Sequence, residues 1–136
     1  MPWNDPDFLR WASVTHAKLG TDSQGIVSAA NATNALFTVP ANHVYLIRNA
    51  SVSIRAAAID SALSQAQLFR GAAAVFIFGQ GLFPVAGSVI NVSHTFFYPL
   101  AAIAGDIARA ISNLANTTVV LSASWTDVDL TKFPFV

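Results

Sequence analysis

Alternation of apolar and polar side chains is the feature that most constrains the fold of this chain. Between Val44 and Ile54 every even-numbered residue except Arg48 is apolar, and polar residues stand at most of the odd positions. The same period of two recurs over 90–98 and 119–125. Successive side chains of a β-strand point to opposite faces of its sheet, so this period predicts half-buried strands. In the last segment the expected inward set is Val119, Leu121, Ala123 and Trp125.

Shorter apolar runs predict further strands over 26–30, 36–39, 74–78 and 107–112. Residues 56–70 fit a helix and a strand equally well by spacing, and we expect a loop followed by a strand. About eight strands at regular spacing result, which is typical of a single all-β domain, a β-sandwich or jelly roll. Turn-forming residues predict the connections, over 20–25, 31–35, 40–43, 79–88, 104–106 and 112–117.

The two ends of the chain differ from its strand-rich middle. Residues 4–19 have the spacing of a short helix that Asn4 or Asp5 caps and Gly20 ends, and an extended arm is the alternative. Each end carries aromatic residues, so each either covers its own domain or docks on a neighbouring subunit. We therefore divide the chain into a helix or docking arm over 1–20, a β-sandwich domain over 21–130 and an apolar tail over 131–136.

Charged residues make up 10% of the chain, against about 25% in an ordinary soluble domain. So few charges protect a surface poorly against self-association, and we expect partner subunits to cover much of it. Seven Lys and Arg balance seven Asp, and this neutrality argues against nucleic acid as a partner, because phosphate binding needs a cationic surplus. The stretch 71–105 contains no Asp, Lys or Arg, but glycines and Pro84 interrupt it, which favours two strands over a membrane span.

Few residues could build an active site. The chain has no Cys and no Glu, and its three histidines, His16, His43 and His94, stand far apart in the sequence. The sequence has no nucleophile elbow and no phosphate-binding glycine loop, so we expect no enzymatic activity, no cofactor and no metal. Asp127 and Asp129 form a close acidic pair near the C-terminus, which we interpret as a solvated strand end, with weak cation binding as the alternative.

Two segments carry a resemblance to a known class of proteins. Residues 37–53, from Phe37 into a long strand, and residues 97–107, with a proline and a Gly-Asp turn, resemble a pattern found in small bacteriophage virion proteins. The pattern covers roughly residues 35–126. Cupin enzymes share it, but they need a His-x-His pair and a Glu that this chain lacks. The resemblance implies a capsid decoration (cement) protein of the virion, a homotrimer that binds the shell of major capsid protein.

The expected contact surfaces are the aromatic N-terminal segment, the uncharged stretch 71–105 and the apolar tail. A tail-fibre or baseplate module that recognises a host receptor or glycan is the alternative, because exposed aromatic rings such as those of Tyr45 and Tyr98 can stack on sugars. The candidate interaction residues are Trp3, Phe8, Leu9, Trp11, Phe76, Phe78, Phe133 and Phe135.

Overall fold

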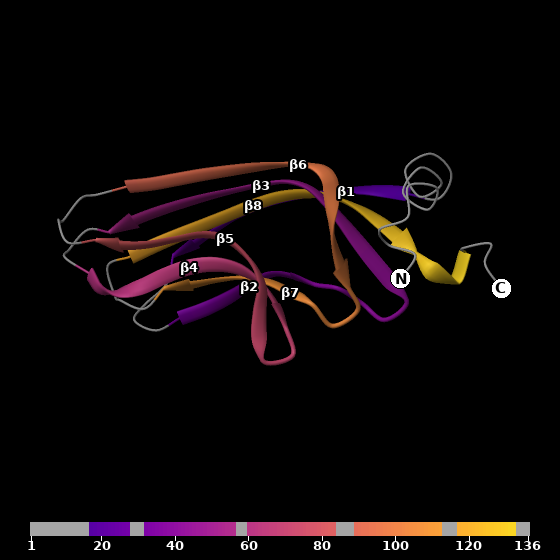
Figure 1. Cartoon of the computed structure of the whole chain (residues 1–136), viewed down its shortest axis with the longest axis horizontal. Coiled ribbons are helices and arrows are strands. Elements are labelled where there is room, and N and C mark those ends of the chain that lie inside the picture. Colours follow the sequence, from indigo (N-terminus) through magenta and orange to yellow (C-terminus); the bar gives the residue numbers. More distant parts are fainter. Residues whose placement is uncertain (1–16, 28–31, 57–59, 84–88, 113–116, 133–136) are drawn as a thin grey trace.

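The computed structural model describes residues 17–27, 32–56, 60–83, 89–112 and 117–132. These residues form strands and one short 3-10 helix, arranged as two antiparallel sheets of four strands each (Figure 1). The expectation of an all-β sandwich is confirmed. The elements are β1 (Ala17–Val27), β2 (Ala32–Thr38), β3 (His43–Ala56), β4 (Asp60–Arg70), β5 (Ala73–Phe83), β6 (Val89–Ile103), β7 (Ile107–Ser112), β8 (Thr117–Asp129) and η3 (Leu130–Lys132).

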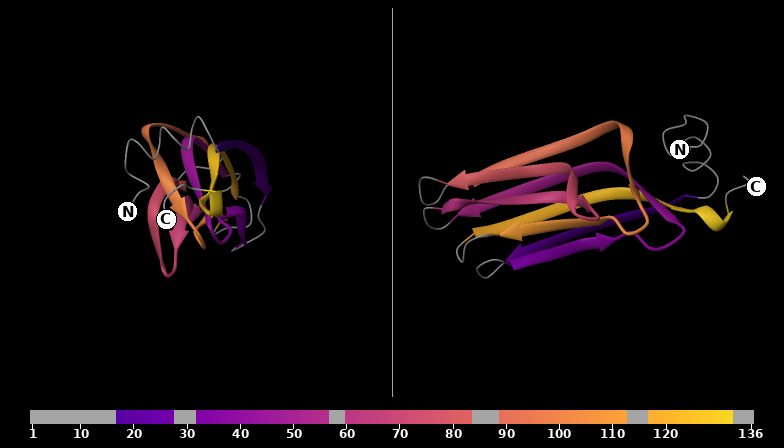
Figure 2. Two further views of the ribbon diagram at one scale, coloured as in Figure 1. Left: turned by 90° about the vertical axis from the view of Figure 1, so that its right-hand side faces the viewer. Right: turned by 60° about the horizontal axis from the view of Figure 1, so that its bottom comes forward.

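The strands pair in a nested order. Sheet A has the order β1-β8-β3-β6, and sheet B has the order β2-β7-β4-β5. Within these sheets β1 pairs with β8, β2 with β7, β3 with β6 and β4 with β5, all antiparallel. The two sheets lie one over the other with β1 near β2 at one side and β6 near β5 at the other (Figure 2). Strands β5 and β6 are therefore the edge strands of the same side of the sandwich.

Apolar residues from both sheets meet in one core between them. The predicted inward residues of β8 are all buried there, from Val119 to Trp125. Sheet B contributes Leu68 and Phe78, which are almost fully buried. A buried side chain of this size stabilises the fold by about 1.5–3 kcal/mol, so this layer supplies the main driving force for folding.

A β-bulge at Arg48 divides β3 into two halves. Odd-numbered side chains face the core before the bulge, and even-numbered side chains face it afterwards. The register of β3 shifts between Ile47 and Asn49 against both of its neighbours. Beyond the bulge the even positions face the core, as expected, but before it Ile47 faces the core instead. The even positions Val44 and Leu46 belong to a second buried cluster with Val128. The prediction that one face of 44–54 is apolar throughout is therefore wrong at its first half, because an extra residue reverses the side-chain alternation.

Several predicted turns belong to strands. Residues 20–25, 32–35 and 79–81 lie in β1, β2 and β5, and residues 17–19, expected at the end of a helix, begin β1. Glycine at position 79 has a packing reason, because a Cβ there would meet the Cβ of Val52 at 3.1 Å. Glycine thus lets β5 approach β3 closely. The strand expected in 56–70 is present as β4, and the rest of the N-terminal helix or arm lies outside the described residues.

Asp106 connects three turns at one end of the sandwich. Its buried carboxylate accepts two hydrogen bonds from the guanidinium of Arg70, Nε to Oδ1 at 2.8 Å and Nη2 to Oδ2 at 2.7 Å. It also accepts a hydrogen bond from the backbone N–H of Ile103, and its own carbonyl accepts one from Val39. The preceding Gly105 has a φ of 87°, which suits glycine in the tight turn that the sequence predicts. The side chain and backbone of one residue therefore hold the β2–β3, β4–β5 and β6–β7 connections together.

Replacing Asp106 with alanine should lower the free energy of unfolding by about 2 kcal/mol. The substitution removes the only carboxylate in this buried network and leaves the guanidinium of Arg70 and the N–H of Ile103 without their partner. Urea denaturation followed by tryptophan fluorescence measures the change. Arg55→Ala, at an exposed position of β3, is the control and should change stability by less than about 0.5 kcal/mol. A loss below about 1 kcal/mol for Asp106→Ala would contradict the role of this carboxylate.

Candidate functional site

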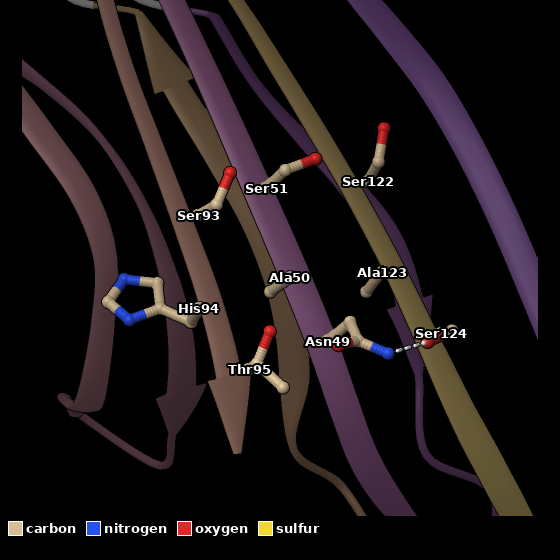
Figure 3. Close-up of a pocket in the computed structure, with 9 residues that line it drawn as sticks. All are labelled: Asn49, Ala50, Ser51, Ser93, His94, Thr95, Ser122, Ala123 and Ser124. Atoms are coloured by element: carbon tan, nitrogen blue, oxygen red, sulfur yellow. Dashed lines mark hydrogen bonds between the residues drawn. The ribbon is translucent and has the colours of Figure 1, made fainter.

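The outer face of sheet A carries a shallow groove lined with hydroxyl and amide groups. Its side chains come from β3, β6 and β8, and the strand register aligns them, since Ser51 stands opposite both Ser93 and Ser122. The groove has a volume of about 310 Å³ (Figure 3). A second, smaller hollow continues it along the strands and shares these serines. The lining residues of the larger hollow are Asn49, Ala50, Ser51, Ser93, His94, Thr95, Ser122, Ala123 and Ser124.

The groove offers hydrogen bonds but no charged group. The side-chain amide of Asn49 donates a hydrogen bond of 3.1 Å to the Oγ of Ser124, which orients the amide along the surface (Figure 3). Each serine or threonine hydroxyl can donate one hydrogen bond and accept two, so a hydroxyl with one partner keeps capacity for another. Figure 3 shows the ring of His94 turned away from these hydroxyls, and its Nε2 lies 2.7 Å from the carbonyl of Phe78. The groove therefore suits a neutral polar ligand.

Exposed apolar side chains gather on β5 and β6. Phe97 and Tyr98 are 90% and 71% exposed, and their rings stand edge to face with centroids 5.0 Å apart. Between Thr95 and Leu100 strand β6 bulges outward, because four of its residues stand opposite Arg48 alone. This bulge presents the two rings to solvent. We call the exposed large apolar residues of these two edge strands the β5–β6 apolar edge; they are Val75, Ile77, Val89, Phe97 and Tyr98.

A second polar cluster joins the start of β3 to the end of β8. Nδ1 of His43 lies 2.6 Å from a carboxylate oxygen of Asp127. Next to this pair the ring of Tyr45 stacks on Trp125 at 5.5 Å, and Phe37 contacts both rings. Burial raises the pKa of Tyr45, and the negative charge of Asp127 raises it further. The described residues include no group of three His, Asp, Glu or Cys side chains that could hold a metal ion.

The structure places the two predicted contact residues of β5 at different depths. Phe78 lies in the core, 1% exposed, so its ring holds the two sheets together. Phe76 is half-buried, and its ring contacts those of Phe78, His94 and Phe96, which joins β5 to β6. The neighbouring Val75 and Ile77 are the exposed large apolar residues of this strand. The period of two over 75–78 separates Val75 and Ile77 from Phe76 and Phe78. The sequence alone does not tell which of the two pairs faces inward.

The other predicted residues have various outcomes. Asp127 and Asp129 have separate partners, since Asp129 accepts hydrogen bonds from the N–H and hydroxyl of Thr131. The groove was missed, because isolated serines carry no motif. The remaining predicted contact residues lie outside the described part of the chain: Trp3, Phe8, Leu9, Trp11, Phe133 and Phe135.

Comparison with protein-family models gives no match, and comparison with curated proteins gives none either. Within the ranges that the structure describes, no helix has the length and apolar character needed to cross a bilayer. Two surfaces of the sandwich are therefore the candidates for its function: the polar groove and the apolar edge.

Tyr45 should titrate above its usual pKa of 10. The chain has two tyrosines, so in the Tyr98→Phe variant the phenolate absorbance near 295 nm reports Tyr45 alone. Because the neutral phenol is favoured in the folded chain, its contribution to stability is present below pH 10 and is lost as the pH rises through the folded pKa. The unfolding free energy should thus fall less steeply above pH 10 in Tyr45→Phe than in the natural chain. An absorbance midpoint at or below 10 would contradict this placement of the ring.

Proposed function

We propose that this protein is a non-enzymatic structural component of a virion, a capsid decoration protein that forms a homo-oligomer and stabilises the shell of major capsid protein. The observation that carries the proposal is the β5–β6 apolar edge. Every large apolar side chain that is exposed among the described residues stands on one of these two strands. Scattered exposed apolar residues need no explanation, but a group of them on one side of a domain marks an interaction surface.

The charge distribution supports a contact between proteins. The edge lies within the stretch 71–105, which carries no Asp, Lys or Arg, so burying it removes no full charge from water. Apolar area buried there contributes about 25 cal/mol per Å². A decoration protein repeats one such contact many times around a shell, so linked copies gain avidity from individually weak contacts.

The strand pairing supports a jelly roll. The first strand pairs with the last, the second with the seventh, the third with the sixth and the fourth with the fifth. This is the order of one long hairpin rolled into a sandwich. We infer that the sandwich is a jelly roll, an architecture that viral capsid domains and lectins share. Fold alone does not decide function, so the surfaces must distinguish these two classes.

Replacing both exposed rings, Phe97→Ser with Tyr98→Ser, should weaken shell binding at least tenfold. The two rings project from a bulge and contribute little to the core, so the variant should keep its stability. The measurement is co-sedimentation with shells assembled from the major capsid protein encoded in the same genome. Asn91→Ala with Thr95→Ala, at exposed polar positions of the same strand, is the matched control and should bind normally. Absence of the natural chain from the shell pellet at tens of micromolar would reject the decoration function.

A tail-fibre or baseplate module that recognises a glycan is the second candidate. The observation that favours it is the groove, where the hydroxyls of Ser93 and Thr95 lie on the same strand as two exposed aromatic rings. Carbohydrates present hydroxyls to hydrogen-bonding groups and apolar ring faces to aromatic side chains. The absence of charge in the groove lining favours a neutral sugar over an acidic one.

The glycan candidate predicts that neutral oligosaccharides perturb the amide NMR signals of Asn49, Ser51 and Ser93 at millimolar concentration. Ser51→Gln, which fills the groove with a longer side chain, should abolish these shifts because the hollow is shallow. Shell binding should not change in the same variant, since the apolar edge is intact. Shifts of equal size in Ser51→Gln would exclude the groove as the sugar site.

A further inference from the structure

Strand β6 presents a regular, unpaired edge of sheet A. It stands last in the strand order of that sheet and, in the described structure, pairs with β3 alone. From Val89 to Thr95 its register with β3 is unbroken. A regular edge strand offers a row of backbone N–H and C=O groups that another strand can bind.

The features that normally protect such an edge are missing from this segment. Proteins block edge strands with charged side chains, prolines or bulges. Residues 89–95 contain no charged residue and no proline, and the bulge and Pro99 come only after Thr95. Strand β5, the other edge on this side, differs, because its register with β4 shifts at several points. The open edge of this side is therefore the first half of β6.

We propose that residues 89–95 of β6 pair antiparallel with the same residues of a second copy of this chain, about a two-fold axis. A strand paired with itself in this way meets its own sequence in reverse, so no second complementary surface is needed. Val92 then stands opposite Val92 of the second copy on the inner face, with Ile90 opposite His94, and Ser93 stands opposite Asn91 on the outer face. The Lys and Arg of the chain balance its Asp, and residues 89–95 include none of these three residue types, so fixed charges do not oppose the approach of two copies.

The pairing joins the two copies of sheet A into one continuous sheet. Its two-fold axis makes the contact a dimer contact, in place of the trimer that the resemblance to decoration proteins implies. Phe97 and Tyr98 lie beyond the paired segment, on the bulge, and stay available for a shell. This pairing rests on the proposed function, which includes a homo-oligomer. It assigns the contact between the copies to residues 89–95 of β6.

Charge substitution at Ser93 tests the pairing. The natural chain should sediment at twice its monomer mass of 14.4 kDa. Ser93→Lys and Ser93→Glu should each weaken self-association at least tenfold, because the two like charges then stand at diagonal positions of the new strand pair, about 7–8 Å apart and within the screening length. Mixing the two variants should restore association, as opposite charges then meet. Ser51→Lys is the matched control: it lies on the same face but one strand inward, beyond the screening length at 0.15 M salt from its counterpart, and should dimerise normally.

A monomer or a trimer of the natural chain would overturn the inference. Equal loss of self-association in Ser93→Lys and Ser51→Lys would also overturn it, because it would indicate packing through the face of the sheet. Shell binding is measured separately in each variant. A monomeric Ser93→Lys that still pellets with shells, more weakly because avidity is lost, supports both the pairing and the decoration function. A dimer that never binds shells supports the pairing and rejects the decoration function.

Discussion

The bidentate ion pair between Arg70 and Asp106 is the interaction on which the geometry of this sandwich most depends. The carboxylate is buried, 1% exposed, whereas the guanidinium is 43% exposed and stays in contact with water. The hydrogen bond to Asp106 is the main cause that raises the pKa of Arg70. Burial of a carboxylate is costly unless hydrogen bonds replace its water shell, and here side chain and backbone provide them. Three strand connections meet at this residue, so the C-terminal end of the edge strand β6 is held at a fixed point.

The bulge opposite Arg48 determines what that edge presents. Because four residues of β6 stand opposite one residue of β3, the strand projects outward between Thr95 and Leu100. The extra length explains why Phe97 and Tyr98 are solvent-exposed although their neighbours Phe96 and Leu100 pack against the core. The same irregularity divides β6 into two parts with different surfaces. Its first half keeps a regular backbone edge, and its middle carries aromatic side chains.

The sequence predicts the parts of this fold that side-chain period controls. The alternation over 119–125 identifies the inward residues of β8 correctly, and the two-sheet all-β class follows from such segments. Arg48 interrupts the same alternation in β3, but a single charged residue does not reveal a bulge, because the extra residue appears only in the pairing with two neighbours. The sequence predicts a turn at Gly79, but the close approach of Val52 is what explains a glycine at this position. Contacts between strands that are distant in the sequence cause both the bulge at Arg48 and the glycine at position 79. A single sequence does not show such contacts.

The same limit explains why the candidate surfaces were predicted only in part. The uncharged stretch 71–105 indicated a contact region, and the exposed apolar residues of β5 and β6 do lie within it. The polar groove could not be found in this way, since its serines come from three strands that only the sheet register aligns. The two surfaces also differ in what can cover them. Burying hydroxyls against an apolar partner costs about 1–3 kcal/mol for each group left without a hydrogen bond, so the groove accepts only a partner rich in polar groups. The apolar edge releases water without that cost, and protein contacts are therefore favoured at the edge while the outer face of sheet A stays hydrated or binds a hydroxyl-rich ligand.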